Sequence, residues 1–265
     1  MELRVLGAVR ARSESGPVNL GHARQRSVLA VLLIEPNEPH PINQLADRVW
    51  GNALPHTAHN TLYGYLHRLR RALTTDGPRI VRTSGGYTLE VDEMAVDLHR
   101  FRSLVRRART AEDEQAFALL DDALDLCRGS ALTGVDSPWL DQVRHILERE
   151  RTSAGLHRND LGLRLGRHHA LLAEVSAQAE ADPLDECLAG QLMLTLYRCG
   201  RQAEALLHYQ RVRRALADEL GVVPGPQLRQ VHQQILGGRP ASVAGVHRAT
   251  TGERSCSTSF TTVAG

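Results

Sequence analysis

The segment from Thr57 to Leu73 carries the polar side chains most suited to binding chemistry. Residues three or four apart share one side of an α-helix, so this segment has two distinct faces when it is wound as a helix. One face is apolar and consists of Leu62, Leu66, Leu69 and Leu73, with Tyr65 at its edge. The opposite face carries amide, imidazole and guanidinium groups, from Asn60, Gly64, His67, Arg68 and Arg71. We expect the apolar face to join a core and the polar face to stay accessible.

No aspartate or glutamate occurs between positions 57 and 73. A solvated helix face usually mixes both signs of charge, so a basic, amide-bearing face without acids indicates a polyanionic partner. Gly64 in a helix interior costs roughly 1 kcal/mol relative to alanine, which is tolerable where another surface must approach closely. Taken alone, the segment leaves a second interpretation open, a solvated helix with a chance cluster of arginines.

Two other segments offer groups of the same kind. Arg79 and Arg82 precede a flexible Ser-Gly-Gly sequence at positions 84–86, which suits a hairpin tip that touches phosphate or a minor groove. The predicted helix N-terminus at His22, Arg24, Gln25 and Arg26 has free N–H groups and a helix dipole that favour phosphate. In a DNA major groove, asparagine pairs with adenine and arginine with guanine in bidentate fashion. The predicted DNA-binding residues are Arg24, Arg26, Thr57, Asn60, Thr61, Tyr63, Gly64, His67, Arg68, Arg71, Arg79, Arg82, Thr83, Ser84, Gly85 and Gly86.

The elements around these residues form a recognisable order. β-rich runs at residues 3–11 and 17–20 predict two short strands around a turn. A helix over residues 22–37 has a predicted buried stripe of Val28, Leu29, Leu32 and Leu33. A second helix over residues 43–51 ends at a glycine in a C-cap position. The basic helix follows, and the runs on either side of Ser84 predict a hairpin over residues 79–91. This order predicts an α+β winged helix-turn-helix domain over residues 1–96, with the hairpin as its wing. We expect this domain to close its own core.

The pattern becomes purely helical from Asp97 onward. Similar Ala-Leu-Leu helix openings begin at Ala118, Ala170 and Ala205. The second interval is close to the tetratricopeptide (TPR) period, so we predict an all-α, TPR-like helical-repeat domain over residues 97–237. The surface of such a solenoid binds partners. Residues 238–265 are rich in small and hydroxyl-bearing residues without periodicity, and they are predicted to be a disordered tail.

Composition limits the possible chemistry. The chain has 265 residues and a net charge of +2, so a basic surface must be local. All 32 basic residues are arginine, which excludes lysine Schiff bases and P-loop lysines. The cysteines are widely spaced, and neither they nor the pair His168-His169 forms a metal-binding pattern. No catalytic motif occurs, so we expect no enzyme activity, no cofactor and no metal.

The chain begins without a signal-peptide pattern, and its longest apolar run, residues 28–34, is too short to span a bilayer. Isolated thiols fit a reducing compartment. We therefore expect a cytoplasmic protein with no membrane association.

The sequence resembles the streptomycete antibiotic regulatory proteins (SARPs). The segments that carry this resemblance are residues 21–33, 45–51, 61–73, 85–91, 97–109 and 183–236. The resemblance covers about residues 1–237 and implies an OmpR-type winged helix joined to a bacterial transcriptional activation domain. It further implies a transcriptional activator of a secondary-metabolite gene cluster. Such an activator binds direct repeats in double-stranded DNA, with a second protomer, and engages RNA polymerase holoenzyme including its sigma factor.

Two departures from the family pattern qualify this expectation. Family members commonly have arginine where this chain has Tyr63, and serine where it has Gly64 or His67. These positions leave the base preference open. The chain also carries neither the nucleotide-binding nor the sensor region of larger relatives, so we expect no built-in switch. A repressor of the same architecture and a helical-repeat adaptor with a non-functional winged helix remain as alternatives.

Overall fold

The computed structural model describes residues 1–73 and 77–238. The chain divides into two compact units, residues 1–161 and residues 162–265, and each is considered by itself. The predicted tail, apart from Gly238, lies outside the described residues. The boundaries predicted from sequence, at positions 96 and 237, stay predictions.

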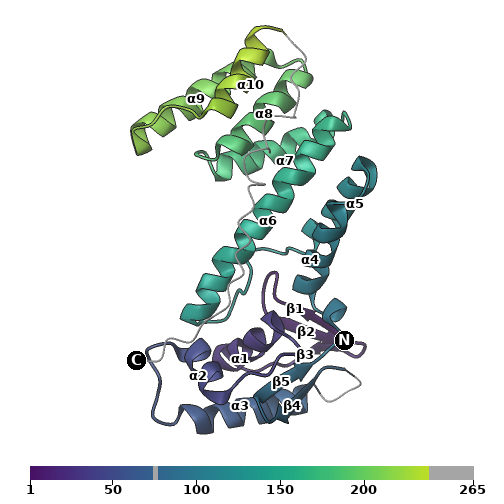
Figure 1. Cartoon of the computed structure of the whole chain (residues 1–265), viewed down its shortest axis with the longest axis vertical. Coiled ribbons are helices and arrows are strands. Elements are labelled where there is room, and N and C mark those ends of the chain that lie inside the picture. Colours follow the sequence, from purple (N-terminus) through teal and green to yellow (C-terminus); the bar gives the residue numbers. More distant parts are fainter. Residues whose placement is uncertain (74–76, 239–265) are drawn as a thin grey trace. The chain divides into compact units, whose positions relative to one another are not determined.

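The first unit begins with a small antiparallel sheet of β1 (Glu2–Arg4), β2 (Arg10–Ser13) and β3 (Gly16–Val18), in that order (Figure 1). The run predicted as one strand, residues 3–11, is interrupted between β1 and β2. There, the backbone pairs with a distant segment: Arg128 N–H donates to Leu6 O at 2.8 Å, and Thr133 N–H donates to Gly7 O at 2.9 Å. The interruption therefore reflects long-range pairing, which local periodicity does not report.

Three helices follow the sheet: α1 (Ala23–Ile34), α2 (Ile42–Trp50) and α3 (Ala58–Ala72). All three were predicted, and their order is confirmed. The stripe predicted for α1 was too narrow, because Ala30 and Val31 are as fully buried as Val28 and Leu29. α1 is covered on several sides: it packs against α2 and α3, touches β5, and its Leu33 carbonyl lies 2.9 Å from His99 Nε2. It forms the centre of this unit.

The predicted wing is a hairpin of β4 (Arg79–Thr83) and β5 (Gly86–Glu90). Its register pairs Arg82 with Tyr87 and Thr83 with Gly86, so the turn lies at positions 84 and 85. The hairpin is tied to the loop before α2, because His40 and Tyr87 exchange backbone hydrogen bonds of 2.8 and 2.9 Å. This pairing fixes the part of β5 next to the turn.

The first unit continues through a short 3-10 helix, η1 (Glu93–Ala95), into α4 (Asp97–Ala108), α5 (Asp113–Asp125) and α6 (Pro138–Arg164). The first unit ends at Leu161, within the last turn of α6. One hydrophobic cluster spans Leu3 to Leu161. The predicted boundary at residue 96 runs through this cluster. Whether residues 1–96 close a core of their own stays a prediction.

Asp97 connects the two sides of that boundary. Its side chain is buried, and its two carboxylate oxygens accept hydrogen bonds from Val5 N–H at 2.8 Å and Leu6 N–H at 3.0 Å. Burial raises the pKa of Asp97 to about 6, against the lowering effect of these backbone donors. The carboxylate thus satisfies backbone groups at the cost of its own desolvation.

The second unit contains α7 (His168–Ala181), α8 (Glu186–Arg198), α9 (Gln202–Leu220) and α10 (Pro226–Leu236). Consecutive helices pack against each other, and α10 also packs on α8. The Asp185 carboxylate caps α8 by accepting from Cys187 N–H at 2.7 Å, and Gly221 ends α9 with a φ of +68°. These helix pairs confirm the TPR-like, all-α prediction.

We expect Asp97→Asn to flatten the pH dependence of stability. The folded-state pKa of about 6 lies above the ordinary value of 3.8, so the folded state binds the proton more tightly than the unfolded state. The contribution of Asp97 is therefore greatest below that ordinary value and declines as pH rises through about 6, by roughly 2 to 3 kcal/mol. Urea unfolding between pH 4 and 7 measures it.

The control is Glu14→Gln, which removes an exposed carboxylate and should leave the slope of stability against pH unchanged. An equal slope in the wild-type protein and Asp97→Asn would contradict the assignment of this titration to Asp97.

Candidate nucleic-acid interface

Helix α3 has the two faces that the sequence predicts. Leu62, Leu66 and Leu69 are fully buried, and Leu73, just after the helix, is buried with them. The exposed side chains on or next to the helix are those of Thr57, His59, Asn60, Tyr63, His67, Arg68 and Arg71, whereas Thr61 and Gly64 are half-buried. Burial of the leucine stripe therefore orients the polar face outward.

Tyr65 holds α3 against the two preceding helices. Its ring packs edge-on against His22 with centroids 5.0 Å apart, and it stacks on Trp50 at 6.3 Å. His22 is the N-cap residue of α1 and Trp50 is the last residue of α2. The aromatic contacts thus connect the start of one helix and the end of another to the basic helix.

Part of the Arg68 guanidinium already makes contacts within the protein. Its Nε donates to Gln25 Oε1 at 2.8 Å, and its guanidinium lies 5.3 Å from the ring centroid of Tyr65. Gln25 is buried on α1. Because an arginine has five N–H donors, this arrangement positions the guanidinium and leaves further donors on it.

Sequence reasoning missed the role of Arg70. Its Nε donates to the carbonyl of Ile80 at 2.6 Å, and its guanidinium lies 5.3 Å from the ring centroid of Tyr87. Tyr63, two turns earlier on the same side of the helix, lies 6.4 Å from the same ring. These contacts join α3 to the wing. Nothing in the local sequence separates Arg70 from the neighbouring arginines except its rotation around the helix, roughly 100° from Arg71.

Five of the predicted wing residues are exposed, and the sixth, Gly86 next to the turn, is packed against another segment. Arg79, Arg82, Thr83, Ser84 and Gly85 are exposed. Gly86 has a φ of +135°, and a Cβ atom there would lie 2.0 Å from the His40 carbonyl oxygen. Gly86 is therefore required for the close approach of the wing to the loop before α2. Its predicted contact with DNA stays a prediction.

Arg24 and Arg26 have contacts that the sequence did not indicate. Arg24 Nη1 donates to the carbonyls of Val49 at 2.7 Å and Asp136 at 2.8 Å, and Nη2 forms an ion pair with the Asp136 carboxylate at 3.2 Å. Arg26 donates to the carbonyls of Gly21 and Gly134. Both guanidinium groups thus connect α1 to the loop before α6. Phosphate contacts from these residues stay predictions.

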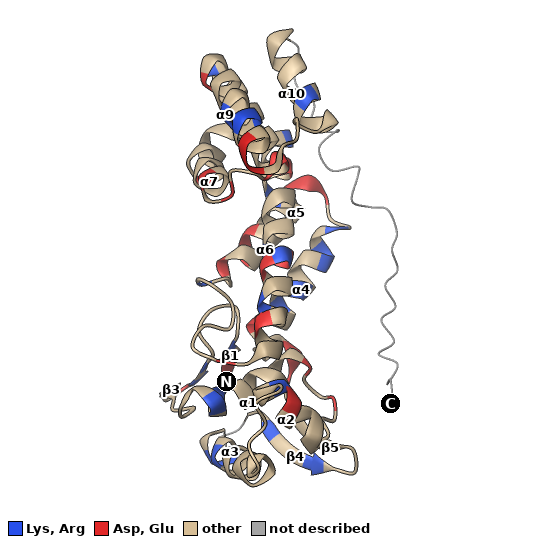
Figure 2. Ribbon diagram, turned by 90° about the vertical axis from the view of Figure 1, so that its left-hand side faces the viewer, with Lys and Arg blue, Asp and Glu red and all other residues tan. Residues whose placement is uncertain are grey.

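The electrostatic character of the surface agrees with the expectation from composition. Figure 2 shows basic positions on α3 and β4. No acidic residue occurs from Gly51 through Leu73, a range that includes the exposed loop before α3.

Across residues 1–73 and 77–238, no group of three or more His, Cys, Asp or Glu side chains is arranged to hold a metal ion. In the same part of the chain, no helix has the length and apolar character needed to cross a membrane.

Comparisons with known proteins agree with this architecture. Residues 96–236 match the family described as bacterial transcriptional activator domain, and residues 17–89 match the one described as transcriptional regulatory protein, C terminal. The chain is 33% identical to Regulatory protein DnrI of Streptomyces peucetius over 256 residues, which cover 91% of this chain and 93% of DnrI. The chain belongs to the SARP family of transcriptional regulators.

This SARP-family chain is also 39% identical to Regulatory protein AfsR of Streptomyces griseus over 240 residues, which cover 89% of the chain. It spans only about a quarter of the length of AfsR, 24%. A solved structure of Mycobacterium tuberculosis EmbR, in complex with a low affinity phosphopeptide, is similar with a TM-score of 0.84 and 30% identity. That similarity covers 91% of this chain and 66% of the EmbR chain.

We expect Gly64→Ala in this SARP-family protein to stabilise the fold while weakening DNA binding. A Cβ at this position meets only Arg68 Nη2, at 3.8 Å, so the substitution should raise the unfolding free energy by about 0.5 to 1 kcal/mol. On the predicted contact face, the added methyl group should keep DNA at a greater distance. Thermal unfolding and fluorescence anisotropy with operator DNA measure the two effects.

The matched control is Ser153→Ala, on an exposed position of α6, which should improve helix propensity without changing DNA affinity. Unchanged DNA affinity in Gly64→Ala would show that DNA does not approach this part of α3.

Proposed function

We propose that this chain is a sequence-specific DNA-binding activator of transcription that controls a secondary-metabolite gene cluster. One observation carries the DNA-binding part of this proposal: the exposed face of α3 contains amide, imidazole and guanidinium groups and no carboxylate. A helix with such a face suits the major groove of B-DNA, whose base edges and phosphates accept hydrogen bonds. Membership of the SARP family supports the regulatory part.

Each group on this surface has a proposed task. Asn60 pairs with a base edge, and adenine is its natural partner. Arg68 and Arg71 contact guanine or phosphate, and the exposed wing arginine Arg82 contacts phosphate at the edge of the adjacent groove. Phosphate contacts position the protein, and base contacts provide sequence preference. The remaining predicted residues around them complete the contact surface.

The helical part has the task of assembly and activation. In this proposal, residues 1–96 read DNA, and residues 97–237 brace a second protomer and present a surface to RNA polymerase holoenzyme, near its sigma factor. A single winged helix reads only a few base pairs, which is too little to distinguish one promoter in a genome. Two protomers on one operator supply the missing specificity.

A repressor of the same architecture is the close rival, because activation depends on where the operator lies relative to the promoter. Transcription in vitro from the natural promoter separates the two functions. An adaptor that does not use its winged helix would bind operator and random DNA equally.

We expect Arg71→Ala and Asn60→Ala to affect DNA binding in different ways. Loss of a phosphate contact at Arg71 should weaken binding to all sequences and reduce the magnitude of the log-log salt slope by about 0.9. Loss of a base contact at Asn60 should instead relax preference at particular positions by about 1 to 3 kcal/mol. Anisotropy titrations against operator variants at several salt concentrations measure both effects.

Arg213→Ala, an exposed arginine on α9, serves as the control and should leave the slope unchanged. A protomer with about four to six phosphate contacts predicts a wild-type slope of roughly −4 to −5. A binding constant that does not depend on salt would contradict a DNA-binding role for the basic face.

The operator should be a direct repeat with half-sites about one helical turn apart, roughly 10 to 11 base pairs. Head-to-tail pairing places both protomers on one face of the duplex. Insertion of five base pairs should abolish activation, because the second protomer rotates to the opposite face. In vitro transcription with purified polymerase and these spacing variants measures the effect. Equal activation from every spacing, or tighter binding to an inverted repeat, would exclude the tandem arrangement.

A further inference from the structure

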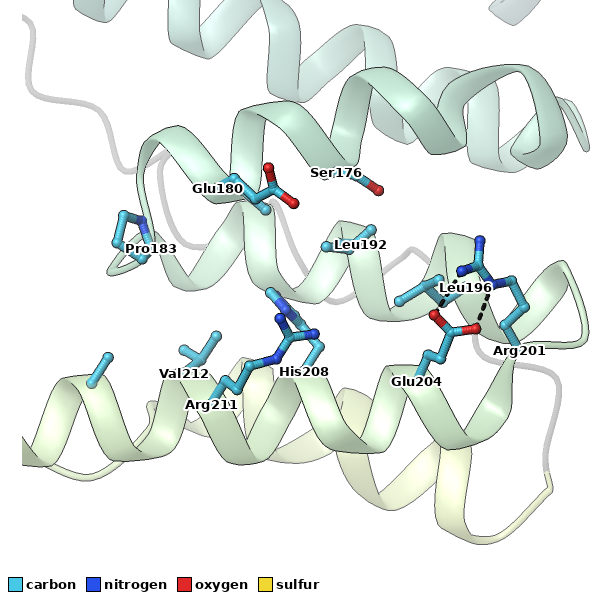
Figure 3. A pocket seen from close by; sticks show the side chains of 12 residues that line it. Ser176, Glu180, Pro183, Leu192, Leu196, Arg201, Glu204, His208, Arg211 and Val212 are labelled. Atoms are coloured by element: carbon cyan, nitrogen blue, oxygen red, sulfur yellow. Dashed lines mark hydrogen bonds and ion pairs between the residues drawn. The ribbon is translucent and has the colours of Figure 1, made fainter.

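The second unit contains a pocket between α7, α8 and α9, with a cavity volume of about 450 Å³ (Figure 3). All of its lining belongs to this unit. Its walls combine apolar side chains with a few charged and polar ones. The residues on which the following argument depends are Glu180, Leu192, Leu196, His208, Arg211 and Val212.

The floor of the pocket is apolar. Leu192, Leu196 and Val212 line it, and Ala179 and Ala215 contribute small side chains. Pockets of about 300 to 1,000 Å³ with mostly apolar walls and a few polar groups are typical of small-molecule sites. This pocket is therefore large enough for a ligand with an extended apolar body.

His208 lies within the pocket wall with an unmet hydrogen-bonding group. The residue is 8% exposed, and its Nε2 is shielded from solvent without a hydrogen-bond partner. Burial first, and then the positive charge of Arg211, lower the pKa of His208, so the imidazole is held neutral. A buried polar atom without a hydrogen-bond partner lowers the free energy of unfolding. An oxygen atom of a ligand would supply the missing partner.

The charges around His208 define the ligand further. Arg201 and Glu204 neutralise each other through paired hydrogen bonds of 2.6 Å at one end of the pocket. Arg211 is exposed, and within residues 1–73 and 77–238 it has neither a hydrogen bond nor an ion pair. Glu180 lies on the α7 side of the same pocket. Arg211 offers one cation for a single carboxylate, whereas the like charge of Glu180 disfavours a polyanion.

We propose that this pocket binds a small amphiphilic monocarboxylate, whose apolar body lies on Leu192, Leu196 and Val212. Its carboxylate forms an ion pair with Arg211 and accepts a hydrogen bond from His208 Nε2. Figure 3 shows both side chains rising from α9 toward α7 and α8. In this proposal, the exposed Arg211 side chain moves aside to admit the carboxylate to the shielded imidazole and then covers it. Charge-assisted hydrogen bonds of this kind are the stronger ones in proteins.

Isothermal titration calorimetry of the full chain with decanoate tests this proposal. Decanol has the same apolar chain without the charge, and it should bind at least about tenfold more weakly than decanoate. Equal affinity for decanoate and decanol, or no saturable binding of decanoate, would overturn the proposal. Because no DNA is present, failure here is distinct from failure of the DNA-binding proposal.

Three variants locate the site. Arg211→Gln should weaken decanoate binding by about tenfold, whereas Arg213→Gln, an exposed arginine on the other side of α9, should leave it unchanged. Ala215→Trp should block the apolar end and abolish binding, with circular dichroism to confirm that this variant folds. Arg211 is a surface residue, so its variant is informative even if Ala215→Trp unfolds. Undiminished binding to Arg211→Gln, or equal losses in Arg211→Gln and Arg213→Gln, would overturn the proposal.

Discussion

The burial of one leucine stripe determines which side chains are exposed on the helix that we propose to read DNA. Helix α3 spans Ala58–Ala72, and its leucine side chains pack into the core shared with α1 and α2. An amphipathic helix that buries one face must expose the other. The aromatic contacts of Tyr65 and the bond from Arg68 to Gln25 then set the orientation of the exposed face. Every base and phosphate contact that we propose for α3 depends on that orientation.

Backbone hydrogen bonding provides the second constraint, and it joins segments that the sequence pattern separates. The polypeptide between β1 and β2 lacks a regular strand partner, so its N–H and C=O groups need other partners. The Asp97 carboxylate and residues 128–133 supply them. The need of these backbone groups for hydrogen-bond partners therefore brings the start of the helical region into the same compact unit as the small sheet. Arg24 and Arg26 strengthen this connection from α1.

The proposed ligand pocket would add ligand binding to the contact with polymerase that we propose for the helical repeats. Helix pairs of a repeat leave grooves wherever small side chains such as Ala179 and Ala215 meet larger ones. In this chain, such a groove also contains a shielded imidazole and an uncommitted guanidinium. A carboxylate ligand there would contact three helices at once. It would thereby couple a small-molecule signal to the packing of the unit that we assign to activation.

The sequence by itself determined the elements and the class of partner. Apolar spacing defined α1, α2 and α3, a Ser-Gly-Gly turn defined the wing, and repeated Ala-Leu-Leu openings defined the helical region, because these signals are local along the chain. The acid-free face of the basic helix was also visible, since it depends only on residue type and helical period. Tertiary structure decided which polar groups are already committed: Arg24, Arg26 and Arg70 bond to backbone carbonyls from distant or neighbouring elements, and Gly86 accommodates His40. It also decided that β1 and Asp97 belong to one compact unit. Such commitments depend on contacts between residues far apart in the chain, and no local pattern of spacing or composition encodes those distances.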